Sequence, residues 1–289
     1  MDSSLHFVDG RSKTVTALGA CQTLGVVDHA VTDTRPLAVR SVLLSTLLGS
    51  QPPRMPVALL VRVGQLFGFT EGAVRTSLTR MVQRGELTAS DSRYELAGAL
   101  LARQRRQAES RSAERGEWSG RWTMAVVTAE GRSAAERSRL RDAMAYLRLA
   151  PQREGVWIRP DNLPHDRAPE HRRIAEEQCA WWVANPRVDD AELAASLWPL
   201  ADWATRATEL RRAMAPLTQR LEDHDESALA EGFVVSAAVL RHFQADPLLP
   251  DELVPRSWPG RRLRQDYDRF DTAYRAVLAH WLRAASDAG

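Results

Sequence analysis

The sequence contains little cysteine and no long apolar run. Its two cysteines, Cys21 and Cys179, lie far apart in 289 residues, so they do not form the dense set of a disulfide-stabilised secreted domain. No stretch approaches the roughly 18 apolar residues that a membrane-spanning helix needs. The start, MDSSLHFVDG, is acidic and polar where a signal peptide is basic. We therefore expect a cytoplasmic protein without a membrane partner.

Lysine is almost absent, and the positive charge that arginine supplies is concentrated in one segment. Lys13 is the single lysine among 39 basic side chains, and the whole chain has a net charge of only +2. Residues 35–106, however, contain eleven arginines and four carboxylates, a local charge of +7 that leaves −5 for the remainder. A basic segment on an otherwise acidic protein indicates that one part of the chain contacts a polyanion.

The sequence also lacks the common signatures of catalysis. It has no Walker loop, no dinucleotide fingerprint and no nucleophile elbow. His165 and His171 fall in an expected proline-broken loop, without the neighbouring cysteines or carboxylates of a metal site. The acids Asp189, Asp190 and Glu192 precede an expected helix, where they favour its dipole. We expect no catalytic residue, no metal and no cofactor, and therefore not an enzyme.

The basic segment has the pattern of three helices and a hairpin. Apolar residues recur at helical spacing in residues 37–49 and 57–68, with a QPPRMP break between them. Thr70 is placed to cap a third helix that runs to about Arg84, and Gly85 is its stop signal. ELTAS and RYELA alternate and are joined by DSR, which predicts two strands. This order predicts a winged helix-turn-helix.

The third helix has the layout of a DNA recognition helix. Its apolar stripe is opposite a polar face centred on Thr76. Central side chains of such a helix meet base edges, with Arg80 suited to guanine and Gln83 to adenine, while flanking arginines pair with phosphates. A polar face directed at water or at another protein is the alternative. The predicted DNA contacts are Arg75, Thr76, Thr79, Arg80, Gln83 and Arg84, with Arg93 and Tyr94 from the wing.

The rest of the chain predicts two further domains. WTMAVV, GVWIRP and CAWWVA read as strands, with a helix over 133–150 between the first two, which favours a small ferredoxin-like unit. Trp181 and Trp182 adjoin on one strand and are expected on opposite faces. The predicted fold class is α+β, divided into a flexible N-terminal arm (1–34, where only ALGACQTLGVV is expected to pack), a winged helix-turn-helix domain with linker helix (35–117), a ferredoxin-like domain (118–195) and a helical C-terminal domain (196–289).

Four stretches of the chain form a characteristic series. They are VRTSLTRMVQRGEL, RYELAGALLARQRRQ, the W-x-G-x-W of residues 118–122, and DPLLPDELVPRSWPG at 246–260, which contains four prolines and predicts a rigid connector between helices. In this order, over about residues 35–280, they resemble the PaaX family of transcriptional regulators, named for the repressor of phenylacetate degradation. The resemblance implies a winged helix, a middle domain similar to Cas2 and a helical C-terminal domain. Glu86 stands where the family usually has tryptophan.

The resemblance also implies a mode of action. Such proteins bind palindromic DNA operators of catabolic genes as homodimers, and repression is typically relieved by an aryl- or acyl-CoA thioester such as phenylacetyl-CoA. The effector candidates are Arg241 and His242 before the connector and Trp258 after it, although capping and helix packing explain them equally well. A regulator that binds DNA without ligand control is an alternative. Another is a Cas2-type metal-dependent nuclease, but Ala129 and Glu130 follow the first strand, where such nucleases have an aspartate.

Overall fold

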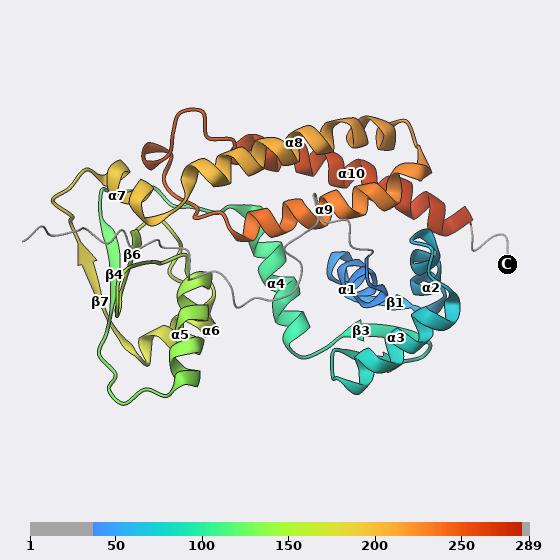
Figure 1. Ribbon diagram of the computed structural model, residues 1–289, viewed down its shortest axis with the longest axis horizontal. Coiled ribbons are helices and arrows are strands. Elements are labelled where there is room, and N and C mark those ends of the chain that lie inside the picture. Colours follow the sequence, from blue (N-terminus) through green and yellow to red (C-terminus); the bar gives the residue numbers. More distant parts are fainter. Residues whose placement is uncertain (1–36, 285–289) are drawn as a thin grey trace, which may run out of the picture.

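The computed structural model describes residues 37–284 of the chain, so the predicted arm and its ALGACQTLGVV segment lie outside the described residues. The described chain forms an arch (Figure 1). Long helices lie along its top, and two smaller units lie below, a four-stranded sheet with its helices at one end and a three-helix unit at the other. Helix α4 (Ala99–Ser112) runs between these two units and up to the top layer.

Three helices and a small antiparallel sheet form the N-terminal unit. The three predicted helices and the predicted hairpin are confirmed, and the tight turn of the hairpin has positive φ at Asp91 and Ser92, as two-residue hairpin loops require. An additional strand, β1, pairs with β3, so the sheet order is β1-β3-β2. The elements are α1 (Val39–Gly49), β1 (Arg54–Pro56), α2 (Val57–Leu66), α3 (Glu71–Gln83), β2 (Leu87–Ser90) and β3 (Arg93–Leu96).

The core of this unit fixes which face of α3 is turned outward. Val74, Leu78 and Met81 are fully buried against apolar side chains of α1 and α2. Helices α2 and α3 approach closely at Gly64, where an added Cβ would lie 2.4 Å from Cγ2 of Val74. Glycine is therefore needed at that crossing, and the polar side of α3 is left on the surface. The unit contacts the top layer through an edge-to-face pair between Phe67 and Phe233.

The second unit has strands and helices in the order β-α-β-β-α-β. Its sheet order is β5-β6-β4-β7, and all neighbouring strands are antiparallel. The three predicted strands are confirmed, while β5 and α6 were not predicted. The elements are β4 (Trp122–Val127), α5 (Ala134–Tyr146), β5 (Ala150–Arg153), β6 (Val156–Pro160), α6 (Pro169–Glu176) and β7 (Cys179–Ala184).

Two expectations for this unit are wrong. The helix expected over 133–150 ends at Tyr146, because the chain turns through a positive φ at Arg148 and enters β5. His171 lies on α6 rather than in a loop; Pro169 occupies the start of that helix, where its missing N–H costs no hydrogen bond. The opposite orientation of Trp181 and Trp182 is confirmed, since Trp181 packs against the core and Trp182 is 58% exposed.

Helices make up the remainder of the described chain, as predicted. They are α7 (Asp190–Leu197), α8 (Leu200–Glu222), α9 (Leu229–Gln244) and α10 (Gly260–Ala284), with short 3-10 turns at Glu226–Ala228 and Asp251–Leu253. The longer three pack around a shared apolar core that includes Met214, Phe243 and Phe270. The 246–260 connector joins α9 to α10, and its Leu249 and Leu253 pack on one face of the four-stranded sheet. None of the helices in the described range combines the length and apolar character that crossing a bilayer requires.

Candidate nucleic-acid interface

Both ends of α3 are defined by side-chain and backbone signals in the sequence. The Thr70 hydroxyl accepts a hydrogen bond from the Ala73 N–H at 3.3 Å, which confirms it as the N-cap. Gly85 adopts a φ of +67° just after the helix, and its N–H bonds to the Val82 carbonyl at 2.9 Å. The helix therefore begins and ends where the sequence predicts.

The six residues predicted on the DNA-facing side of α3 are all exposed. They form two rows along the helix because residues four apart share a face. One row lines a groove, described below. In the other row, two side chains form hydrogen bonds within α3 itself. The Arg75 Nε donates to the Glu71 carboxylate at 2.7 Å, and the Thr79 hydroxyl donates to the Arg75 carbonyl at 3.1 Å. The first row is Thr76, Arg80 and Arg84, and the second is Arg75, Thr79 and Gln83.

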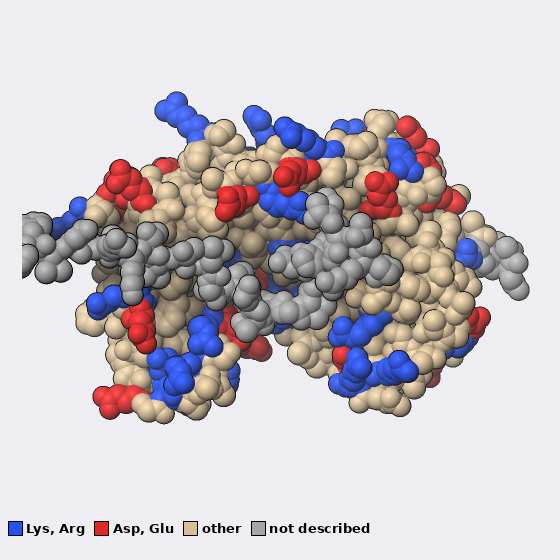
Figure 2. Space-filling view, viewed as in Figure 1, with Lys and Arg blue, Asp and Glu red and all other residues tan. Residues whose placement is uncertain are grey.

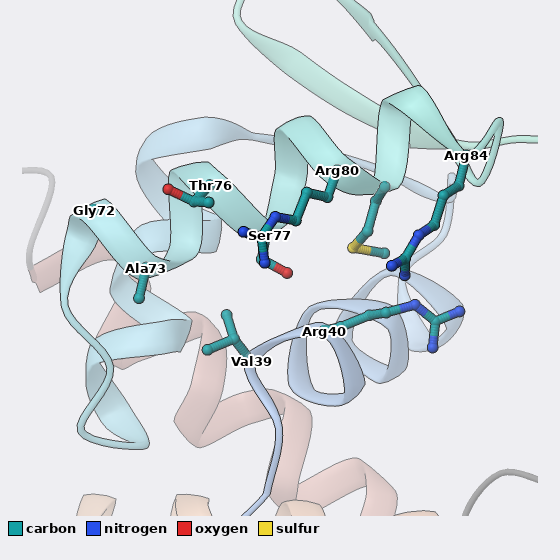
Figure 3. A pocket seen from close by; sticks show the side chains of 9 residues that line it. Val39, Arg40, Gly72, Ala73, Thr76, Ser77, Arg80 and Arg84 are labelled. Atoms are coloured by element: carbon teal, nitrogen blue, oxygen red, sulfur yellow. The ribbon is translucent and has the colours of Figure 1, made fainter.

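A groove of about 410 Å³ runs between α3 and the start of α1 (Figure 3). Arg80 and Arg84 extend from α3 toward it, and Val39 and Arg40 of α1 form its other side. None of the described residues that line it is acidic. Figure 2 shows basic side chains gathered over α1 and α3 on the same part of the surface. The lining of the groove therefore contributes three arginines and no carboxylate of its own.

The arginines at this groove differ in how far they are neutralised. Arg40 is bound by both oxygens of Glu86, at 3.0 and 2.9 Å, in a partly buried pair that ties the start of α1 to the chain after α3. Among the described residues, no carboxylate forms an ion pair with Arg80 or Arg84. The Glu86 carboxylate thus has a structural partner, whereas no described carboxylate neutralises Arg80 or Arg84.

The two predicted wing residues occupy different environments. Arg93 is exposed at the first position of β3, beside the hairpin turn. Tyr94 is half-buried, and its ring packs against the apolar core of the unit. Of the pair, Arg93 is the side chain that the structure presents to solvent.

The predicted effector residues are brought together only in part. The Trp203 ring stacks between His242, with ring centroids 4.3 Å apart, and Trp258, at 4.5 Å. Burial lowers the pKa of His242 to about 4. Trp258 lines a large groove beside the connector, whereas Arg241 and His242 do not line it. Trp203, which joins the two predicted aromatics, was missed because it lies about 40 residues before His242 on a different helix.

The chain after β4 shows no arrangement that favours metal chemistry. The N–H groups of Thr128 and Ala129 both donate to the Gln178 carbonyl, at 3.0 and 3.2 Å, and Glu130 is exposed beyond them. Within the described range, no three histidine, cysteine or acidic side chains are grouped as a metal site would need.

Comparisons with known proteins cover nearly all of the described chain. A family model described as "PaaX-like protein" matches residues 38–100, "PaaX protein central Cas2-like domain" matches 115–184, and "PaaX-like protein C-terminal domain" matches 198–285. A solved structure of the uncharacterized protein Rv0674 from Mycobacterium tuberculosis is 39% identical in sequence. It aligns with a TM-score of 0.65 over 84% of this chain and 98% of its own. No curated protein matches the sequence.

Proposed function

This chain belongs to the PaaX-like protein family, and on that premise we propose that it is a transcriptional regulator that binds double-stranded DNA through α3. The observation that carries the proposal is the exposed row of Thr76, Arg80 and Arg84 along a groove without acidic lining. The apolar side of α3 is buried in the N-terminal unit, so its exposed polar row is held in a fixed direction. Such a row suits insertion into a major groove. Arg80 and Arg84, which no carboxylate of residues 37–284 neutralises, supply charge for phosphates or guanine edges.

The proposal treats the N-terminal unit as a winged helix-turn-helix. The order of three helices with a three-stranded antiparallel sheet supports this, with α3 as the recognition helix and the β2–β3 hairpin as the wing. Arg93 on the wing would then reach a neighbouring phosphate. We assign residues 35–117 to this DNA-binding part with its linker helix, 118–195 to a ferredoxin-like domain and 196–289 to the helical domain.

We further propose that the regulator acts as a homodimer on a palindromic operator. Strand β7 supports this, because it lies at the edge of its sheet and exposes large apolar side chains. Trp182 and Val183 on this strand are 58% and 61% exposed. An edge strand with such exposed side chains favours pairing with a second copy. Two copies would place their α3 helices in successive major grooves, about 34 Å apart or a multiple of that.

The effector we propose is an aryl- or acyl-CoA thioester such as phenylacetyl-CoA, which releases a repressor from DNA. Release requires that the thioester bind one dimer geometry, which does not fit the operator spacing, more tightly than it binds the geometry that fits DNA. The large groove that Trp258 lines offers room and positive charge for such a ligand.

Fluorescence anisotropy with DNA from upstream of the protein's own gene tests the proposal. The wild-type protein should bind this DNA more tightly than a scrambled duplex, and phenylacetyl-CoA or another CoA thioester should release it. The Gln83→Ala variant should lose a base contact. The difference in binding free energy between the upstream duplex and the scrambled duplex should therefore shrink by about 1 to 3 kcal/mol. Arg212→Ala, on the exposed side of α8, serves as a matched control. Equal binding to both duplexes by the wild-type protein would exclude sequence-specific regulation through this helix.

A further inference from the structure

Arginine side chains continue from the N-terminal unit along the first half of α4. Arg103 and Arg106 are three residues apart, so they project from one side of this helix. Between Glu95 and Glu109 the chain carries three arginines and no carboxylate. Figure 1 shows α4 in the space between the N-terminal unit and α5, the first helix of the second unit. The arginines of α4 therefore lie between the groove beside α3 and α5.

The arginines of α4 repel one another and have no carboxylate partner. Burial, and then repulsion by Arg106 and Arg40, lowers the pKa of Arg103. Arg40 also lines the groove beside α3, so one set of like charges extends from that groove to α4. Glu86 pairs with Arg40, but no carboxylate of residues 37–284 forms an ion pair with Arg103 or Arg106. Cations that the protein itself does not compensate suit a polyanion.

An aromatic pair joins α4 to α5. The Arg106 guanidinium lies over the Tyr146 ring at 4.6 Å, and His171 of α6 packs on the same ring, with centroids 4.0 Å apart. Burial, and then repulsion by Arg106, lowers the pKa of His171. Asp142 and Glu170 act on His171 in the opposite direction, yet within the described range neither forms an ion pair with Arg106. The junction is therefore fixed in position and keeps the positive charge of Arg106.

Arg139 continues the row of positive charge on α5. It precedes Tyr146 by seven residues, about two turns, so the two side chains share one face of the helix. Arg139 is exposed, and no described carboxylate forms an ion pair with it. The nearby Glu136 is held at the helix start, where its Oε2 accepts the Ser133 N–H and hydroxyl, both at 2.7 Å. Figure 2 shows basic side chains gathered over α5, at the same lower edge of the molecule as those over α1 and α3.

We propose that Arg103, Arg106 and Arg139, here named the α4–α5 surface, bind backbone phosphates of the duplex beyond the base pairs that α3 reads. The inference rests on the proposed DNA-binding function, because it needs a duplex held by α3. Helices α4 and α5 are each about 10 Å across, so the surface extends about 20 Å from the N-terminal unit. One turn of DNA is about 34 Å long, so a duplex that leaves α3 on this side passes the surface within one turn.

The chemistry of the surface suits phosphate rather than base contacts. Guanidinium groups on two separate helices can each bind a phosphate oxygen of the same strand or of facing strands. Phosphate contacts carry no sequence information of their own. The α4–α5 surface should therefore add affinity and salt dependence to DNA binding, while the preference for one sequence over another remains with α3.

Fluorescence anisotropy of the full-length protein separates this contact from base reading. The Arg103→Ala/Arg139→Ala variant should bind the upstream DNA more weakly. Its plot of the logarithm of the association constant against the logarithm of salt concentration should be shallower by about 2, since each phosphate contact contributes about 0.9. The ratio of affinities for the upstream and scrambled duplexes should stay within about twofold of the wild-type ratio. Arg103→Lys/Arg139→Lys, which keeps both charges, and Arg212→Ala, outside the surface, should keep the wild-type slope.

Hydroxyl-radical footprinting locates the contact on the DNA. The wild-type protein should protect the backbone up to about one turn beyond the segment held by α3. The Arg103→Ala/Arg139→Ala variant should lose this flanking protection and keep the rest, whereas Arg80→Ala/Arg84→Ala should weaken the protection of the whole site.

The outcomes distinguish this inference from the proposed function. Wild-type affinity, slope and flanking protection in the Arg103→Ala/Arg139→Ala variant would overturn the inference and leave binding by α3 untouched. An equal loss of affinity in the lysine variant would also overturn it, because packing rather than charge would then be the cause. A lost preference for the upstream duplex would do the same, since the surface would then read bases. Absence of DNA binding by the wild-type protein would refute the proposed function itself.

Discussion

The buried cation Arg159 on β6 is the side chain whose loss should destabilise the protein most clearly. It is only 4% exposed, and burial together with repulsion by Arg148 and Arg167 lowers its pKa to about 9, so it keeps its proton at neutral pH. Its guanidinium donates hydrogen bonds to five protein oxygens, and the bond to Leu248 joins the sheet to the connector. The acceptors are the carbonyls of Pro160 (2.9 Å), Arg148 (3.2 Å), Leu248 (3.3 Å) and Leu147 (3.5 Å) and the Asn162 side chain (2.6 Å).

The size of the effect follows from these contacts. Arg159→Met keeps most of the side-chain volume but leaves the acceptors without this donor. Each buried acceptor that loses its partner costs about 1 to 3 kcal/mol, and three of the five bonds are 3.2 Å or shorter. Removing the charge also removes its desolvation penalty, which offsets part of the loss. We expect a net destabilisation of about 3 kcal/mol, which for a slope of about 3 kcal/mol/M lowers the urea midpoint by about 1 M.

Urea unfolding followed by tryptophan fluorescence measures this change, since Trp157 lies on the same strand. Arg159→Lys keeps the charge but has three donors on a single atom, so an intermediate loss is expected. Arg153→Met, at an exposed position of the same sheet, should change stability by less than about 0.5 kcal/mol. An Arg159→Met midpoint within 0.2 M of the wild type would refute the reasoning that these bonds hold the connector to the sheet.

Two further predictions concern the helical layer and α4. The pKa of His242 falls from 6.5 in the unfolded chain to about 4 in the fold, so the unfolded state takes up the proton first. Stability should therefore be lost as pH falls from about 6.5 toward 4, by at most about 1.4 kcal/mol per pH unit. Thermal melts of His242→Phe, which keeps a ring beside Trp203, should show a flatter pH dependence in that window; an unchanged slope would contradict the assignment. Gln104→Met removes the donor to the Leu48 and Ser50 carbonyls and should raise amide exchange at the end of α1, measured by mass spectrometry, with a local cost of about 1 to 2 kcal/mol. Unchanged exchange there would show that α4 is not held to α1 by this side chain.

The elements that the sequence predicts well are those with strong periodicity or clear end signals. Helix α3 combines a buried stripe, an N-cap at Thr70 and a stop at Gly85, and all three act as expected. The elements missed were β1, β5 and α6, which are short and contain or begin with proline. Strands β1 and β5 lie at sheet edges, where a missing N–H is tolerated, and tertiary pairing rather than local pattern determines them.

The candidate sites divide in the same way. The exposed face of α3 could be predicted because a single helix carries it and burial of its other side determines its direction. The packing of Tyr94 into the core could not be read from its place in an alternating strand. The large groove beside the connector was missed because the arginines that line it come from segments more than 130 residues apart, each of which alone resembles an ordinary charged surface. Such a cluster becomes apparent only when the connector and α10 are placed beside the end of α4.

The salt dependence of DNA binding tests the central claim most directly. For the wild type, the logarithm of the association constant should fall steeply with the logarithm of salt concentration. The Arg80→Ala/Arg84→Ala variant should bind more weakly, with a slope shallower by about 2, because each lost phosphate contact removes about 0.9. If only Arg84 contacts a phosphate and Arg80 reads a base, the slope should change by about 1 and the preference for operator over scrambled DNA should fall. A double variant with wild-type affinity, slope and preference would contradict the account, because α3 would then not be the DNA-binding surface.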